Sequence, residues 1–166
     1  MNIIAVAGST IPSDTANSLQ VMKACQALAQ LDQQVTLLVP GVQNKSVDLQ
    51  THYGLQANFP IEWLASPSRR LFTWRAVRRA RALKADLLYS WFPQSAVFGL
   101  ISRLPVILEV HIQPTGHFGP LWYRLFANLR GRKRLAFITR ALVALLERDF
   151  GIHFPKAEAV IAPNGV

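Results

Sequence analysis

The chain has 166 residues, of which 51% are hydrophobic and 16% are charged, and its formal net charge is +9 at pH 7. These values fit one globular domain with its own core, and they exclude an intrinsically disordered chain. The longest uncharged run, residues 87–102, is too short to span a bilayer.

Cys25 is the only cysteine, which excludes an internal disulfide, and no Cys and His residues have zinc-finger spacing. Cys25 lies within a helical apolar pattern, which predicts a small buried hydrophobe in a reducing compartment, not a nucleophile. No signal peptide is visible at the first residues. We therefore expect a cytoplasmic protein.

The positive charge is concentrated in one region. Residues 69–140 hold fourteen basic and two acidic side chains, whereas residues 1–68 and 141–166 are each slightly acidic. This distribution predicts an anionic partner on one face: nucleic acid, anionic lipid or a phosphorylated substrate.

Short apolar runs alternate with helical patterns along the chain. The predicted strands span residues 2–7, 34–39, 58–64, 86–91, 106–111, 135–138 and 159–162. The predicted helices span residues 17–31, 71–84, 93–102, 120–128 and 139–150, with residues 45–54 as a short helix or loop. This order predicts an α/β fold, in which a doubly wound, mostly parallel sheet of about seven strands has helices on both faces.

The loop after the first strand begins Gly8-Ser9-Thr10 and leads to the first helix, for which Asn17 or Ser18 is the predicted N-cap. Free backbone N–H groups at such a helix start favour phosphate. The loop lacks G-x-G-x-x-G, and no acidic residue closes the second strand, which argues against a nicotinamide dinucleotide site. A plain tight turn at Gly8 is the alternative.

Glu109 and His111 end the strand at residues 106–111, and a loop rich in Gly and Pro follows. Residues i and i+2 of a strand point to the same side. An apolar strand that ends in an acid and a histidine is typical of a site at the carboxyl edge of a parallel sheet. The alternative is a local pair at a strand end with a structural role only.

The helix at residues 71–84 divides into two arcs at 100° per residue. Its predicted core arc is Ala76, Val77, Ala80 and Leu83. Its opposite arc carries Trp74, Arg75, Arg78, Arg79 and Arg81. A tryptophan within an arginine face is typical of an interfacial membrane helix, and residues 122–134 could extend that surface. An ordinary solvated helix face is the alternative, and no nucleic-acid-binding motif is present.

Several weak motifs occur in a consistent order: N-I-I-A-V-A-G-S-T-I-P-S at the first strand, A-D-L-L-Y-S before an apolar helix, P-V-I-L-E-V-H at residues 105–111, and I-A-P-N-G-V at the end. With this ordered set the whole chain resembles the N-terminal domain of GT-B glycosyltransferases, specifically glycosyltransferase family 4. The resemblance implies a Rossmann-like, acceptor-side domain over residues 1–166. A second domain, outside these residues, would hold most of the nucleotide-sugar donor.

The resemblance also implies roles for individual residues. His111 matches the family's cleft histidine, and Glu109 would orient it or contact acceptor hydroxyls. Gly8 and Ser9, with Ala16, Asn17 and Ser18 at the helix start, would face the donor diphosphate or the acceptor. Many members have a Gly-Gly pair in this loop, and this chain does not.

The activity that the resemblance implies is a retaining, hexosyl-type transfer without metal or other cofactor. The implied partners are a nucleotide-sugar donor and a sugar or lipid-linked acceptor, with no nucleic acid. The basic helix makes the inner face of an anionic membrane a candidate site of peripheral attachment. The alternative is a stand-alone α/β module that binds anions or membranes without chemistry.

Overall fold

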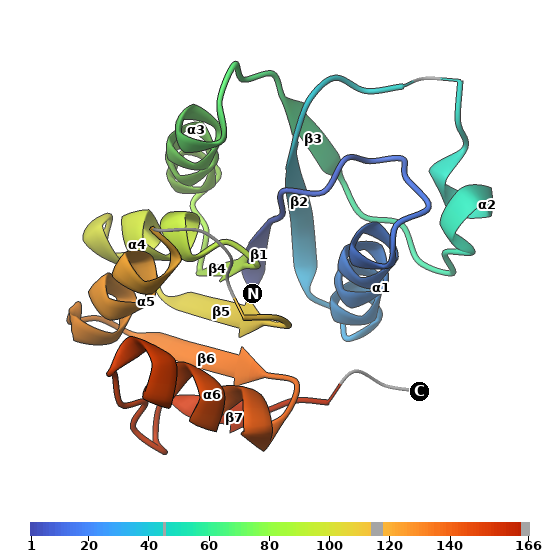
Figure 1. Ribbon diagram of the computed structural model, residues 1–166. Helices are drawn as coiled ribbons and strands as arrows, with labels where there is room; N and C mark the ends of the chain where they lie inside the picture. The colour runs from blue at the N-terminus through green and yellow to red at the C-terminus, as the bar shows by residue number, and fades with distance from the viewer. Residues whose placement is uncertain (45, 114–117, 164–166) are drawn as a thin grey trace.

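The computed structural model describes residues 1–44, 46–113 and 118–163. Seven strands form one sheet in the order β3-β2-β1-β4-β5-β6-β7, and every neighbouring pair is parallel (Figure 1). The strands are β1 (Asn2–Val6), β2 (Gln34–Pro40), β3 (Ile61–Leu64), β4 (Leu87–Ser90), β5 (Val106–Val110), β6 (Lys133–Phe137) and β7 (Ala159–Ile161). The helices are α1 (Ala16–Gln30), α2 (Leu49–Tyr53), α3 (Arg69–Ala82), α4 (Pro93–Ile101), α5 (Gly119–Asn128) and α6 (Arg140–Phe150). The predicted fold class is confirmed.

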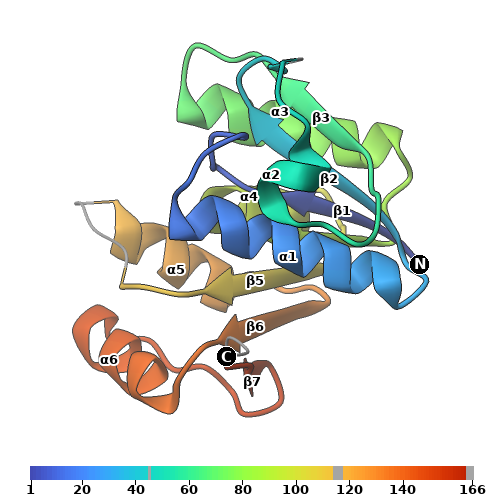
Figure 2. The same cartoon turned by 90° about the vertical axis from the view of Figure 1, so that its right-hand side faces the viewer.

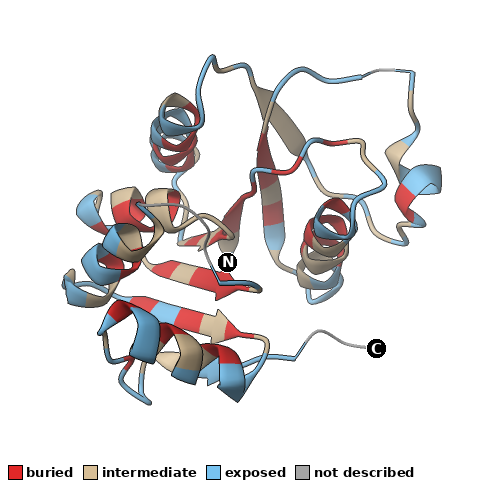
Figure 3. Ribbon diagram, viewed as in Figure 1, coloured by how far each residue is buried: buried red, intermediate tan, exposed pale blue. Residues whose placement is uncertain are grey.

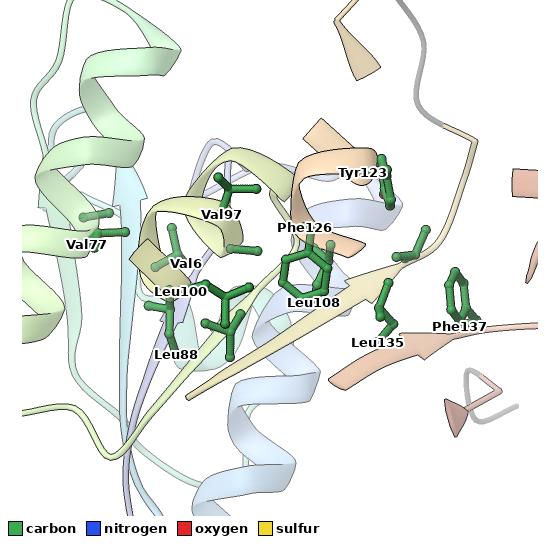
Figure 4. Packing of buried hydrophobic residues seen from close by; sticks show 14 of the residues in the cluster. Val6, Val77, Leu88, Val97, Leu100, Leu108, Tyr123, Phe126, Leu135 and Phe137 are labelled. Carbon is green, nitrogen blue, oxygen red and sulfur yellow. The ribbon is translucent and has the colours of Figure 1, made fainter. Parts of the chain in front are cut away.

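Two hydrophobic cores lie on opposite faces of the sheet. Helices α3 to α6 cover one face, where Leu88, Leu108 and Leu135 of successive strands pack against side chains such as Val97 and Phe126 (Figure 4). Helix α1 covers β1 and β2 on the other face, with α2 beside it (Figures 1 and 2). The near-continuous apolar strands follow from this two-sided burial, since a parallel strand inside such a sheet has no solvent face.

Several predicted boundaries are corrected. Strand β3 begins at Ile61, not residue 58, because Pro60 has no N–H for the ladder. Strand β6 begins at Lys133, two residues before the predicted start, in register with Val106. Strand β5 ends at Val110, so His111 is the first residue beyond it.

Hydroxyl side chains cap three helices, α1, α3 and α6, and the first two begin earlier than predicted. Thr15, not Asn17 or Ser18, caps α1: its Oγ1 accepts the N–H of Ser18 at 3.3 Å. Ser68 caps α3 by accepting the N–H of Leu71, so that helix starts at Arg69, two residues before the predicted start.

The sheet order reverses between β1 and β4. Strands β1, β2 and β3 extend to one side of this point, and β4 to β7 extend to the other. The loops that leave the carboxyl ends of strands on the two sides diverge there, and such a crevice is where open α/β sheets bind ligands. The predicted site residues of β1 and β5 lie at this edge.

Candidate active site

A three-residue chain of side chains joins β4 and β5 at the carboxyl edge of the sheet. Nε2–H of His111 donates to Oε1 of Glu109, and the hydroxyl of Tyr89 donates to Oε2 of the same carboxylate. The predicted pairing of Glu109 with His111 is present, and it follows from their i, i+2 spacing. Tyr89 was not singled out from the sequence.

Strand register explains why Tyr89 reaches Glu109. Tyr89 pairs with Ile107 in the ladder between β4 and β5, so its side chain lies on the same face as Ile107 and Glu109. This is the face covered by α1 over the neighbouring strands. Glu109 is only 9% exposed, which places an ionisable pair inside a largely apolar wall.

The pKa of Glu109 is lower than its ordinary value of 4.5. Burial, the largest single influence, favours the neutral carboxyl, but hydrogen bonds from His111 and Tyr89 and the attraction to His111 outweigh it. The pKa of Tyr89 is raised, first by burial and then by the negative charge of Glu109. The carboxylate therefore stays ionised and the phenol stays protonated, which keeps Tyr89 a donor.

Trp91 flanks this chain. Its ring contacts Tyr89 edge-on, with centroids 4.9 Å apart. Its buried Nε1 makes no hydrogen bond of normal geometry to the residues that the structure describes, yet it lies close enough to Glu109 to add a small lowering of the carboxyl pKa. Trp91 is therefore a neighbour of both Tyr89 and Glu109 in this chain of side chains.

Gly8 allows close contact between two loops of the site edge. A Cβ at Gly8 would lie 1.8 Å from Cζ of Phe92, so the Phe92 ring occupies the space that any side chain would need. Phe92 begins the turn from β4 into α4, which is fixed by Ser90: its Oγ accepts the N–H of Phe92 at 2.9 Å. Contact with Phe92 therefore explains why position 8 is a glycine, in addition to any need for a tight turn.

Of the other predicted ligand residues of the β1–α1 loop, two are exposed and two are buried. Asn17 is exposed, and its Nδ2 donates to Oγ of the buried Ser9 at 2.8 Å. Ala16 is exposed at the first turn of α1. Ser18 is fully buried, and its hydroxyl donates to the carbonyl of Thr15 at 2.8 Å. The Ser18 side chain is thus engaged within the loop.

The β1–α1 loop and the end of β5 flank β4. Val6 pairs with Ser90, which pairs with Leu108. Gly8 and Ser9, which follow β1, are therefore level with Val110, the last residue of β5, and with His111, which follows it. Two strand spacings separate them, about 10 Å. A ligand bound at this edge could contact both loops.

Helix α3 presents the predicted basic face. Ala76, Val77 and Ala80 are buried, and Leu83 is half-buried, which confirms the core arc. Trp74 and the arginines at 75, 78, 79 and 81 are exposed, as predicted.

Three of these arginines have specific partners. Arg79 holds Glu62 through two bonds of 2.6 and 2.7 Å. Arg75 donates to the carbonyl of Ala65, and the guanidinium carbon of Arg78 lies 4.7 Å from the centre of the Trp74 ring. Within the residues that the structure describes, Arg79 is the one arginine of this face paired with a carboxylate.

The described part of the chain holds neither a cluster of metal-ligating side chains nor a membrane-spanning helix. Within residues 1–44, 46–113 and 118–163, no three His, Cys, Asp or Glu side chains group as metal ligands would. No helix there has the length and apolar character to cross a membrane. Cys25 is buried, as predicted, and burial raises the pKa of its thiol, an effect to which the charge of Glu109 adds.

This chain is similar to known proteins in sequence and in fold. The sequence model of Glycosyltransferase Family 4 matches residues 19–166. No curated protein matches the chain. HepE of Anabaena, solved in complex with UDP and glucose, superposes with a TM-score of 0.65 at 17% identity, over 100% of this chain and 45% of HepE.

The spinosyn rhamnosyltransferase SpnG, solved with thymidine diphosphate, superposes with a TM-score of 0.50 at 15% identity, over 83% of this chain and 45% of SpnG. At these identities the two structures establish a shared fold. The chain spans less than half the length of either.

Proposed function

Because this chain belongs to Glycosyltransferase Family 4, we propose that it forms the acceptor-side domain of an enzyme that moves a sugar from a nucleotide-sugar donor to an acceptor. The observation that carries the proposal is the chain Tyr89–Glu109–His111 at the carboxyl edge of the sheet, beside the point where the strand order reverses. The nucleotides bound by HepE and SpnG support a nucleotide-sugar donor.

In this proposal His111 is the catalytic residue. The anomeric carbon of the donor becomes cationic in the transition state, and a polar group fixed nearby stabilises that charge without reorganising. Both carboxylate oxygens of Glu109 accept hydrogen bonds from protein side chains, and the residue is 9% exposed. These contacts favour Glu109 as the group that orients His111 over Glu109 as a contact to acceptor hydroxyls.

The β1–α1 loop is the proposed contact to the diphosphate or the acceptor. The exposed amide of Asn17, held by the buried Ser9, is available to a ligand, and the first turn of α1, from Ala16, offers backbone N–H groups and contains no acidic residue. Gly8 lets this loop lie against Phe92. Ser18 contributes through the loop that it holds together.

The reaction proposed is retaining, hexosyl-type and independent of metal, with the donor held mainly by a second domain of the enzyme. The acceptor is a sugar or a lipid-linked sugar. A cytoplasmic enzyme attached to the inner face of the membrane through Trp74, Arg75, Arg78, Arg79 and Arg81 would meet such acceptors, and the exposure of these side chains supports that location.

The test is nucleoside diphosphate release by the full-length enzyme from a panel of UDP-, TDP- and GDP-sugars, with and without acceptors. His111→Ala should lower kcat by about two orders of magnitude or more while the protein still folds, with a thermal unfolding midpoint lowered by a few degrees because Glu109 loses one donor. His153→Ala is the matched control, because His153 is an exposed histidine in the segment between α6 and β7, paired with Glu147 at 3.0 Å.

Near wild-type turnover of the His111→Ala enzyme would remove His111 from the mechanism. Absence of release from every nucleotide-sugar by a folded full-length protein would contradict the transferase proposal itself.

A further inference from the structure

Helix α5 carries an apolar stripe that faces away from the core. Phe118 at its N-cap, Leu121 and Leu125 are 60%, 48% and 39% exposed. Their spacing of three and four residues places them on one side of the helix. Trp122, Tyr123 and Phe126 face inward, and Trp122 packs edge-on against Phe98 with ring centres 5.7 Å apart. The hypothesis that residues 122–134 extend the basic surface is therefore wrong for these three aromatic residues.

The stripe meets the basic helix. Helices α3, α4 and α5 lie side by side on one face of the sheet, with α4 in the middle (Figures 1 and 2). Helix α4 exposes little between them, while the outer sides of α3 and α5 are exposed (Figure 3). The guanidinium carbon of Arg70 on α3 lies 5.8 Å from the centre of the Phe118 ring, which joins the two helices at their N-terminal ends.

A second contact continues this row along α3. Arg78 lies over Trp74, which is 46% exposed, and Arg70, Trp74 and Arg78 follow one another at intervals of four residues. We use the name α3–α5 surface for six exposed side chains of these helices: Arg70, Trp74, Arg78, Phe118, Leu121 and Leu125.

No carboxylate belongs to either helix of this surface. The two acidic residues among residues 69–140 are Asp86, which accepts the N–H of Asn2 at the opposite edge of the sheet, and Glu109, which is held by Tyr89 and His111. Large exposed apolar side chains beside cations, on two helices that carry no carboxylate, match one partner chemistry well: a bilayer with anionic headgroups.

We infer that the α3–α5 surface docks on an anionic lipid bilayer, with Trp74, Phe118, Leu121 and Leu125 in the headgroup region and the arginines against phosphates. The inference rests on the membrane attachment in the proposed function and deepens it by extending the docking surface from α3 to α5, but its evidence does not depend on sugar transfer. It adds α5, which supplies most of the exposed apolar side chains, to the basic face of α3.

The fold places this surface at the edge that carries the candidate active site. In a parallel α/β sheet each helix that follows a strand begins at the carboxyl edge. Arg70 and Phe118 are therefore at the same edge as His111, and Phe118 is seven residues after it, a reach of at most about 25 Å. A lipid-linked acceptor held in the bilayer would lie close to His111.

The experiment measures co-sedimentation of the full-length protein with vesicles of equal parts phosphatidylcholine and phosphatidylglycerol. The test variants are Leu121→Gln with Leu125→Gln, and Arg70→Gln with Arg78→Gln. We expect each double variant to bind the vesicles about tenfold more weakly, or weaker still. Each arginine at such a surface contributes about a fivefold increase in affinity. Circular dichroism and thermal unfolding check that the variants remain folded.

Matched controls separate this surface from general attraction. Leu31→Gln removes an exposed leucine from the C-terminal end of α1, and Arg148→Gln with Lys156→Gln removes the same charge from the α6 end of the molecule. Both controls should bind as the wild type does. In vesicles with brominated lipid, fluorescence quenching should be lost in Trp74→Phe, which removes the exposed indole.

Three outcomes would overturn the inference: wild-type protein that stays in solution, α3–α5 variants that bind as the wild type does, or controls that lose binding equally. Dimerisation that disappears in Leu121→Gln with Leu125→Gln, without vesicle binding, would assign the surface to a second copy of the chain. Transfer to a soluble acceptor distinguishes the two proposals, because it tests the active site and needs no membrane.

Discussion

The phenol of Tyr89 on β4 and the imidazole of His111 beyond β5 hold opposite oxygens of one carboxylate, Glu109. The position of His111 is therefore set by two strands. A group that must meet a transient charge needs such support, because its effect depends on being in place before the charge develops.

Tyr89→Phe should reduce turnover without removing any group from the proposed contact with substrate. The substitution removes one donor to a buried carboxylate, a loss of about 1.5–3 kcal/mol in the free energy of unfolding. We expect kcat to fall while KM changes little, and the pKa of Glu109 to rise towards its ordinary value. Urea denaturation, steady-state kinetics and NMR titration of Glu109 measure these effects.

Tyr53→Phe is the control for this prediction. Tyr53 OH accepts the N–H of Ser13 at 2.7 Å, so its loss also lowers stability. Because Tyr53 is on α2, away from Glu109, the titration of Glu109 should be unaltered. An equal change of that titration in both variants would contradict a specific role for Tyr89.

Stability should depend on the ionisation of Glu109. Its pKa is lower in the folded state than its ordinary value of 4.5, so the unfolded state binds the proton more readily. The stabilisation is therefore present above about pH 4.5 and is lost as the pH falls through the lower, folded-state pKa. Denaturation of Glu109→Gln over the same pH range should show a shallower decline than the wild type.

Gly8→Ala should destabilise the site edge by about 1–3 kcal/mol, since the new methyl group overlaps the Phe92 ring. The double variant with Phe92→Ala should be less destabilised than the sum of the single variants, because the clash is then absent. Urea denaturation of all four proteins in the cycle gives the coupling. Additive losses would contradict the clash with Phe92 as the cause of the Gly8→Ala loss.

Lys133→Met should cost about 3 kcal/mol of stability. Lys133 is 7% exposed, and its Nζ donates to the carbonyls of Phe126, Ala127 and Leu129 at 3.0, 2.6 and 2.7 Å. The substitution leaves these carbonyls at the end of α5 without their donor. Arg134→Met, at the next and exposed position, should change the free energy of unfolding by less than about 0.5 kcal/mol.

The sequence predicted the architecture well for a physical reason. Apolar strands such as Val106–Val110 and helix-spaced cores such as Ala76, Val77 and Ala80 are local patterns that a two-faced parallel sheet requires. The Glu109–His111 pair was also predictable, because i, i+2 spacing in a strand settles it.

The missed features depend on contacts between distant segments. Tyr89 reaches Glu109 only because β4 lies beside β5 in one register, and Phe92 meets Gly8 only because β4 lies beside β1. The α5 stripe was missed because an apolar residue on an amphipathic helix is normally assigned to the core. The sequence does not show which of two apolar arcs the neighbouring helix will cover.

The two ends of α5 differ in how they are held. The ammonium group of Lys133 ties the last carbonyls to the sheet, whereas at the first turn, within the described residues, no side chain caps the free N–H groups beside Phe118. Fraying of α5 should therefore start at the exposed apolar end, and its amide protons should exchange with solvent in a gradient along the helix. Helix α5 is thus an element with one fixed end and one adaptable end, and the adaptable end lies closest to His111 in the chain.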